Sequence, residues 1–173
     1  MKKALLLSNL SFSMIGAGQI WLVQLSSYPL WTHVGPAQFR DYHIAWWHSI
    51  QGPIFIPAGL AILCTIGLLR HRSVSRRALW VSIVLICLIY GLTFVWWAPL
   101  MALIGANPGE WAATLRWAPQ LQGLQGRTQE QLYHLLIETH WLRLALVTAY
   151  AAVIFWVALR DPEMGRGPGS SRT

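Results

Sequence analysis

Long uncharged stretches separated by short clusters of charge dominate the hydropathy pattern of this chain. No formal charge occurs between Lys3 and Arg40, and residues 4–25 are apolar enough to cross a bilayer. Further uncharged runs cover residues 47–69, 78–104 and 144–159. A helix needs about 20 mostly apolar residues to cross a hydrocarbon core of about 30 Å. The pattern therefore predicts an all-α integral membrane four-helix bundle, formed as a single domain by residues 1–160.

Prolines and caps mark the expected helix ends. Tyr28-Pro29 should end the first span, because the residue before a proline resists helical geometry. Gly35-Pro36 should begin the next helix, with proline at its first position. Pro53 and Pro57 should kink or restart that helix, and Pro99 should bend or end the third span. The two helical hairpins show no sequence repeat.

The fourth span should begin in polar sequence. Thr128 with Gln131 fits a capping box, so a helix should run from Gln129 to about residue 159. Its charge-free part is only about 24 Å long, which is shorter than the hydrocarbon core. The outer end of this span must therefore include Trp141 and Arg143. The preceding connection, residues 105–126, has no clear period and is either a loop or a short helix.

The distribution of charge predicts the orientation. The chain carries 13 Lys and Arg residues and a formal charge of +7. Nine of the 13 lie at the N-terminus, in the 70–77 loop, at the end of the fourth span or in the tail, which four spans place on one side. Under the positive-inside rule both termini are cytoplasmic, in the cell inner membrane, and residues 161–173 form a disordered cytoplasmic tail. Basic residues that flank apolar runs also argue against a nucleic-acid partner. The N-terminus resembles a signal peptide in part, but a retained first span fits its interrupting polar residues better.

Polar residues inside the spans point to helix contacts and to a site. We expect the polar side chains of the first span to face other helices, since lipid cannot satisfy them; these are Asn9, Ser11, Ser13, Gln19 and Gln24. Five of the six histidines fall at the outer end, which is the end away from the termini. The densest stretch is Asp41–Pro53, DYHIAWWHSIQGP. Ionisable groups buried near one end of a bundle suggest binding, proton transfer or a metal.

Helical phase limits how these histidines can cooperate. At about 100° per residue, His43 shares a face with Trp47 and Gln51, whereas His48 lies about 140° away. One unbroken helix therefore cannot easily aim both histidines at one ion. On the fourth span, Glu130, His134 and Glu138 share a face, and His140 points toward Arg143. A metal would take His43 or His48 together with His134 and Glu138, and imidazole with carboxylate does not select one transition metal. Two axial histidines for haem are a further option.

Structural alternatives remain open for each candidate. His43, His48 and His140 either form hydrogen bonds between helices or act as ligands or proton acceptors. His134 and Glu138 either lie on a solvated helix face or bind a metal. Arg143 either extends to the membrane interface or holds an anionic group. Many of the 11 tryptophans fit an interfacial aromatic belt, and Trp47 and Trp141 are candidates for a hydrophobic binding cleft together with Gln24 and Gln51.

Four segments carry a resemblance: VQLSSYPLWTHVG, FRDYH, WAPLMAL and ETHWLR. Together they resemble a family of uncharacterised bacterial four-helix membrane proteins, distantly similar to anthrone oxygenase-like membrane proteins. The resemblance covers nearly all of the chain up to about residue 159, and it implies functional importance for eight residues: Gln24, Tyr28, Pro29, Tyr42, His43, Pro99, Trp141 and Arg143. His140 stands where relatives usually have asparagine, and Met101 where a polar residue or histidine is expected.

Two functions follow from these observations. The first is an integral membrane protein whose outer cluster binds a lipid, a small hydrophobic molecule or a partner. The second, which the resemblance suggests, is a membrane oxidoreductase acting on a hydrophobic substrate that enters from the bilayer, with or without a metal or haem. His43 or His48 would act as the base, and Arg143 would stabilise a developing enolate or phenolate oxygen. Both functions require the Asp41–Pro53 segment to approach the residues 138–143.

Overall fold

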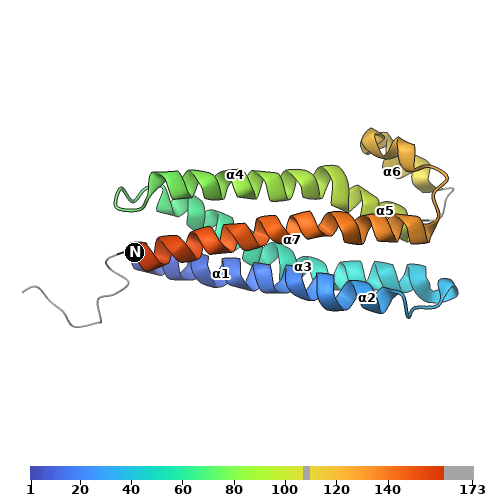
Figure 1. Cartoon of the computed structure of the whole chain (residues 1–173), viewed down its shortest axis with the longest axis horizontal. Helices are drawn as coiled ribbons and strands as arrows, with labels where there is room; N and C mark the ends of the chain where they lie inside the picture. Colours follow the sequence, from blue (N-terminus) through green and yellow to red (C-terminus); the bar gives the residue numbers. More distant parts are fainter. Residues whose placement is uncertain (107–109, 162–173) are drawn as a thin grey trace, which may run out of the picture.

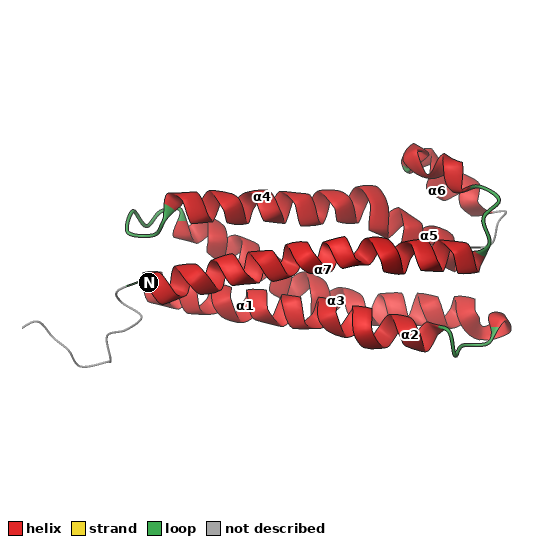
Figure 2. Cartoon of the chain, in the orientation of Figure 1, coloured by secondary structure: helices red, strands yellow, loops and turns green. Residues whose placement is uncertain are grey.

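The computed structural model describes residues 1–106 and 110–161, and it is a bundle of long helices (Figures 1 and 2). Four segments are long and apolar enough to cross a membrane, which bears out the predicted number of spans and indicates an integral membrane protein. They cover Lys2–Trp31, Ala37–Leu68, Arg76–Gly105 and Gln129–Arg160. No strand occurs within the described residues. The predicted tail lies outside the described residues from residue 162 onward.

The first and third spans share one interruption. The first consists of α1 (Lys2–Leu22), a π-helical turn η1 (Val23–Ser27) and α2 (Tyr28–Trp31), and the third of α4 (Arg76–Leu92), η2 (Thr93–Trp97) and α5 (Ala98–Gly105). Each π-turn is followed by one residue and then a proline, Pro29 or Pro99. A proline cannot donate to the carbonyl four residues earlier and clashes with it. The wider turn accommodates the proline, so the helix continues past it.

The predicted end of the first span at Tyr28-Pro29 is therefore wrong. The helix continues through this dipeptide to Trp31, because the π-turn absorbs the disturbance that proline causes. The third span bends at the same kind of turn, as Pro99 predicted. There, the Val95 carbonyl, which an α-helix would pair with the residue at position 99, accepts a hydrogen bond from the Gln120 side chain instead.

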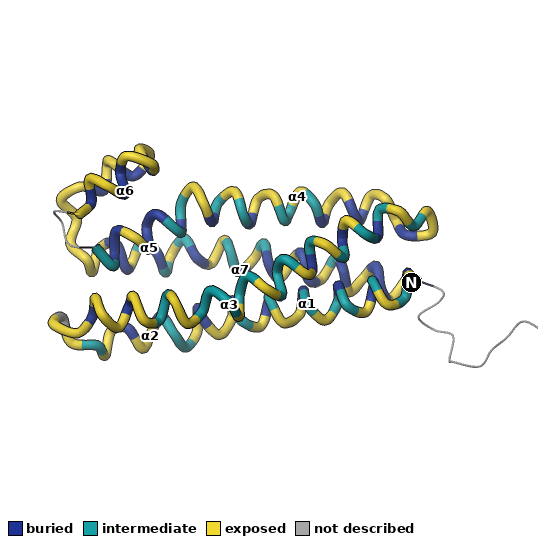
Figure 3. Tube along the Cα trace, turned by 180° about the vertical axis from the view of Figure 1, so that it is seen from behind, coloured by how far each residue is buried: buried dark blue, intermediate teal, exposed yellow. Residues whose placement is uncertain are grey.

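The second span is one unbroken helix, α3 (Pro36–Leu68), that contains Pro53 and Pro57. It does not restart at either proline, but its path changes direction part-way along, as Figure 3 shows. Helix α3 packs closely on α1 and only loosely on α4 and α5. In the most apolar 18-residue stretch of this span, 11% of the residues are buried inside the bundle. The corresponding share is 33% for the first and fourth spans. Among the four spans it is thus the one least covered by the rest of the bundle.

The fourth span is the helix α7 (Gln129–Arg160), and it begins at the predicted capping box. Thr128 Oγ1 accepts from the Gln131 backbone, and the Gln131 side chain accepts from the Thr128 backbone. The preceding connection is mostly helical, with α6 (Trp111–Trp117) and a 3₁₀ turn η4 (Pro119–Leu124). Buried leucines of this connection join the core of the same end of the bundle.

Both ends of the described chain lie at the same end of the bundle, called here the terminal end (Figure 1). There, the Lys2 ammonium lies 3.0 Å from the Asp161 carboxylate, and both side chains are buried. Lys2 also donates to Ser73 in the connection between α3 and α4, at 3.2 Å. The opposite end, called the distal end, carries the connections from α2 to α3 and from α5 to α7. There, Arg40 Nη2 lies 3.0 Å from both carboxylate oxygens of Glu110.

A buried polar network joins three helices in the terminal half. Asn9 of α1 donates to Thr65 Oγ1 of α3 at 3.0 Å, and Tyr150 of α7 donates to Asn9 Oδ1 at 2.9 Å. The Thr65 hydroxyl in turn donates to the Ala61 carbonyl at 2.9 Å. These bonds bear out the expected inward position of Asn9. Ser11, by contrast, is exposed, so that prediction is wrong: its helical phase points it away from the neighbouring helices.

Candidate functional site

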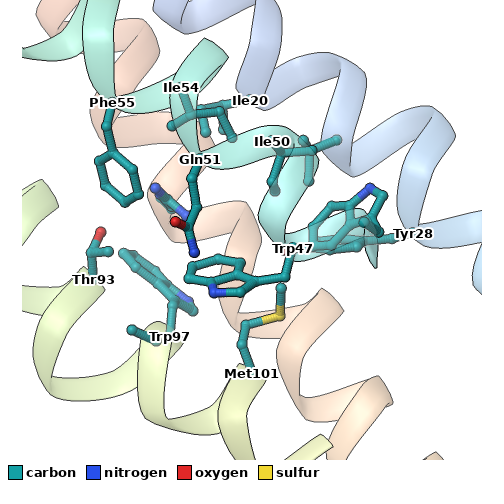
Figure 4. A pocket seen from close by; sticks show the side chains of 14 residues that line it. Ile20, Tyr28, Trp47, Ile50, Gln51, Ile54, Phe55, Thr93, Trp97 and Met101 are labelled. Carbon is teal, nitrogen blue, oxygen red and sulfur yellow. The ribbon is translucent and has the colours of Figure 1, made fainter. Parts of the chain in front are cut away.

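A narrow cavity lies inside the distal half of the bundle, between all four spans (Figure 4). Its volume is about 20 Å³, which is room for about one water molecule in this closed arrangement. Aromatic and aliphatic side chains form most of the lining, and Gln51, Thr93 and Arg143 supply polar groups. We call this the aromatic cavity; the remaining lining residues are Ile20, Val23, Tyr28, Trp46, Trp47, Ile50, Ile54, Phe55, Trp97, Ala98 and Met101.

The cavity brings together the two segments that the sequence analysis required to meet. Trp47 and Gln51 of the Asp41–Pro53 segment line it from α3, and Arg143 lines it from α7. Figure 4 shows the Trp47 and Trp97 rings on either side of the space that Gln51 enters. The two π-turns contribute Val23 and Trp97, so the cavity sits where both interrupted helices depart from α geometry. Such turns are frequent at functional sites.

Arg143 is the cation of this cavity. Its guanidinium carbon lies 5.6 Å from the centroid of the Trp97 ring, which is within the range of a cation–π interaction. Its Nε is buried and has no hydrogen-bond partner within the part of the chain that the structure describes. The ion pairs found among residues 1–106 and 110–161 do not include Arg143. The bundle thus holds a guanidinium with unused hydrogen-bonding capacity beside a cavity.

His140 is fixed by a hydrogen bond to Gln24. Its Nδ1–H donates to Gln24 Oε1 at 2.8 Å, and Gln24 Nε2 donates onward to the Ile137 carbonyl at 3.5 Å. A glutamine oxygen only accepts, so Nδ1 carries the proton and Nε2 of the neutral ring is an acceptor. That Nε2 is buried without a partner among the described residues. The His140 ring lies 4.9 Å from Tyr28, a lining residue, so it forms a layer directly behind the cavity wall.

His43 has a different environment from His48, as helical phase predicted. His43 is buried, and its Nε2 donates to the Met101 carbonyl at 3.1 Å. The Trp31 ring lies 4.9 Å from it, and Phe39 stacks on it at 5.9 Å. His48 is exposed on another face of α3. Neither histidine lines the aromatic cavity. Both line a neighbouring pocket of about 380 Å³ between α3 and α5, so the base role predicted for either of them stays a prediction for that pocket.

The residues suggested as metal ligands do not gather. His134 and Glu138 are exposed on α7, and the nearest carboxylate to His134 is that of Glu130, at 3.9 Å. Within residues 1–106 and 110–161, no group of three or more His, Cys, Asp or Glu side chains could hold a metal ion. The predicted set of His43 or His48 with His134 and Glu138 therefore does not form, since these side chains occupy different faces of the bundle.

The four suggested binding residues have three different positions. Trp47 and Gln51 line the cavity, and Gln24 lies behind it as the partner of His140. Trp141 is exposed, and its ring meets Trp21 edge-on at 6.3 Å on the outer surface of the bundle. Sequence reasoning from helical phase did not find Trp97, which lies against Arg143. The one sequence signal near it is the Ala98-Pro99 pair that directly follows its π-turn.

Comparison with known proteins gives no relative. No protein-family model matches the chain, and neither the curated proteins nor the solved structures contain a match. The resemblance to four-helix bacterial membrane proteins therefore stays a hypothesis, and function must be argued from the geometry of the cavity.

Proposed function

We propose that this integral membrane protein binds a small hydrophobic molecule in the aromatic cavity, with an acceptor oxygen of that molecule on Arg143. The observation that carries the proposal is the half-buried Arg143, which lines the cavity and whose buried Nε has no partner among the described residues. Charged side chains inside membranes are costly, and they typically mark substrate sites or counter-ion sites. An oxygen-bearing ligand would satisfy the donors that the protein leaves unused.

Extension of the side chain to the interface does not account for Arg143. It lies 14 positions after the start of α7, about 21 Å along the helix axis at about 1.5 Å per residue. Helix α7 is about 48 Å long, so with a centred hydrocarbon core of about 30 Å this places Arg143 roughly 12 Å below the distal interface. Its ring partner Trp97 is buried, which also holds the guanidinium inside the bundle.

Ligand entry requires the cavity to widen, and α3 is the helix that can move. It supplies the largest share of the lining, including Trp47 and Phe55, yet packs only loosely on α4 and α5. Outward displacement of the middle of α3, around Phe55, from Thr93 of the third span would open the cavity toward the lipid. The hydrogen bond from His43 to the Met101 carbonyl would keep the distal part of α3 on α5. A hydrophobic molecule dissolved in the bilayer could then enter sideways.

The test uses anthracene-9-carboxylate, whose absorption overlaps tryptophan emission, added to the purified protein in detergent. We expect saturable energy transfer, and an affinity at least tenfold weaker in Arg143→Met. Arg160→Met is the matched control, because Arg160 lies on the same helix and also stacks on a tryptophan, Trp156, at 4.6 Å. The uncharged 9-methylanthracene should bind the wild type and Arg143→Met alike. Equal affinity of the carboxylate for the wild type and Arg143→Met would contradict the proposal.

A membrane oxidoreductase is the second candidate, and one observation favours it. The imidazole of His140 is oriented by Gln24 and keeps a free Nε2 acceptor, three residues before Arg143 on the same helix. A base and a cation so arranged suit proton abstraction next to a developing oxyanion. His140 is therefore the candidate base next to Arg143, behind the Tyr28 wall of the aromatic cavity, whereas His43 and His48 are candidates for the neighbouring pocket. An absorption spectrum and metal analysis of the purified protein distinguish a metal or haem enzyme from a cofactor-free one.

For the orientation, we propose that both termini face the cytoplasm of a cell with an inner membrane. The support is the positive-inside rule applied to Lys2, Lys3 and the basic loop at residues 70–77. A reporter fused after Arg72 should be active only on the cytoplasmic side. Reporter activity outside the cell would show that the topology is the reverse of the one proposed. It would not affect the proposed binding to Arg143.

A further inference from the structure

A second narrow cavity lies one helical turn from the aromatic cavity, toward the terminal end. Its volume is about 60 Å³. Each of the four spans that line the first cavity also lines the second, through a residue four positions away. The pairs are Ile20 and Gly16 on α1, Ile54 and Ala58 on α3, Thr93 and Ile89 in the third span, and Arg143 and Val147 on α7. Because residues four apart lie on one face, the two cavities follow one another along the bundle axis.

Small side chains make this second cavity a crevice. Gly16, Ala58 and Ala61 line it, together with the larger Ile86 and Tyr90. A Cβ atom added at Gly16 would meet no other atom within 4 Å, so the space beside this glycine is open. The floor is Tyr150, whose hydroxyl is held by Asn9 in the polar network of the terminal half. The crevice is therefore apolar along its walls and closed by a hydrogen-bonded group.

From these observations, and resting on the proposed function, we propose that the ligand is a single-chain amphiphile. Its oxyanion head would bind Arg143, and its apolar tail would follow the crevice past Gly16 and Ala58 to Tyr150. Arg143 and Tyr150 are seven residues apart on α7, so this path is about 10 Å long. The second cavity has a volume of only about 60 Å³, so it would take one chain and not the paired chains of a phospholipid.

Head and tail have separate roles in this arrangement. Lipid tails are as apolar as the crevice, so burying the ligand tail gains little hydrophobic free energy relative to the bilayer. Affinity must come from the charge-assisted hydrogen bonds of Arg143. The crevice then selects the shape of the ligand, because a tail that cannot follow it keeps the head away from the guanidinium.

Photo-cross-linking tests this proposal directly. The probe is a long-chain fatty acid with a diazirine in its tail, added to the full chain in detergent, and the labelled residues are identified by mass spectrometry. We expect label on the residues that face the crevice from α1 and α3, near Gly16 and Ala58. Gly16→Leu should reduce this label at least fivefold. Gly18→Leu is the matched control, because Gly18 is exposed on the same helix and also has open space beside it.

Anthracene-9-carboxylate separates failure of this proposal from failure of the proposed function. Its compact ring needs only the aromatic cavity, so Gly16→Leu should bind it like the wild type, which also shows that the variant is folded. Ala58→Leu provides a second blocking variant on another helix. Label that is confined to outward-facing residues such as Leu22, or that Gly16→Leu does not reduce, would contradict binding of the tail in the crevice. It would leave the proposed binding to Arg143 intact. If a diazirine phospholipid labels the crevice residues as strongly as the fatty acid does, the ligand is not restricted to a single chain.

Discussion

Replacing Gly105 by alanine should destabilise the bundle through a single atom. Gly105 is the last residue of α5, and a Cβ atom there would lie 2.6 Å from Cδ2 and 3.1 Å from Nε2 of His43. The imidazole cannot easily move away, because Trp31 and Phe39 pack on it and its Nε2 donates to the Met101 carbonyl. Either that hydrogen bond breaks or α5 separates from α3.

The size of the effect follows from three contributions. Forcing an extra carbon into a packed contact costs about 1–3 kcal/mol, and losing the partner of a buried polar group costs about 1–3 kcal/mol. Alanine returns about 0.5–1 kcal/mol over glycine in a helix. The expected loss in the free energy of unfolding is therefore about 3 kcal/mol, or roughly a hundredfold in the unfolding equilibrium.

Unfolding by increasing SDS in mixed micelles, followed by circular dichroism, measures this loss. Gly91→Ala is the control, because a Cβ atom at Gly91, on α4, would meet nothing within 4 Å. The double variant His43→Ala with Gly105→Ala should be much less destabilised than the sum of its single changes, since the two residues share one contact. If Gly105→Ala unfolds at the same SDS fraction as Gly91→Ala, the close approach of α3 and α5 at His43 is wrong.

Two further stability predictions use the same SDS assay. Tyr150→Phe removes the hydroxyl that donates to Asn9, and should lower the free energy of unfolding by about 0.6–1.7 kcal/mol, as hydrogen bonds between membrane helices do. The control Tyr42→Phe, at an exposed position, should have no measurable effect. Equal effects of the two changes would contradict a stabilising network. Lys2→Met removes the ammonium 3.0 Å from the buried Asp161 carboxylate and should destabilise the bundle more than Arg40→Met. Arg40→Met, at an exposed ion pair with Glu110, should cost less than about 1 kcal/mol. The reverse order would show that the terminal ends of α1 and α7 are held by other contacts.

Sequence reasoning succeeded where a single helix decides the outcome. The 140° between His43 and His48 predicted that the two would have different surroundings on one helix, and His43 is buried while His48 is exposed. The capping box at Thr128 depends on four consecutive residues and formed as predicted. The number of spans depends only on runs of apolar residues, so it too could be predicted.

Prediction failed where the outcome depends on backbone geometry or on several helices together. Proline rules place a helix end at Tyr28-Pro29, but a π-turn, which has no residue signature of its own, carries the helix through. Gln24 and His140 were each identified as candidates, but their pairing depends on how α7 packs on the first span, 116 residues apart in the chain. The same holds for Arg143 over Trp97, because no local pattern specifies which helices adjoin.

The bond between Asn9 and Tyr150 also has a consequence for biosynthesis. The two residues are 141 positions apart, so the first span enters the membrane long before its last partner exists. At about 5–20 residues per second, roughly 7–28 s of translation separate them. During that interval the asparagine sits in a helix whose final neighbour is missing. Until α7 arrives, Asn9 can pair only with Thr65 of α3, so the three-helix polar network is completed by the last span.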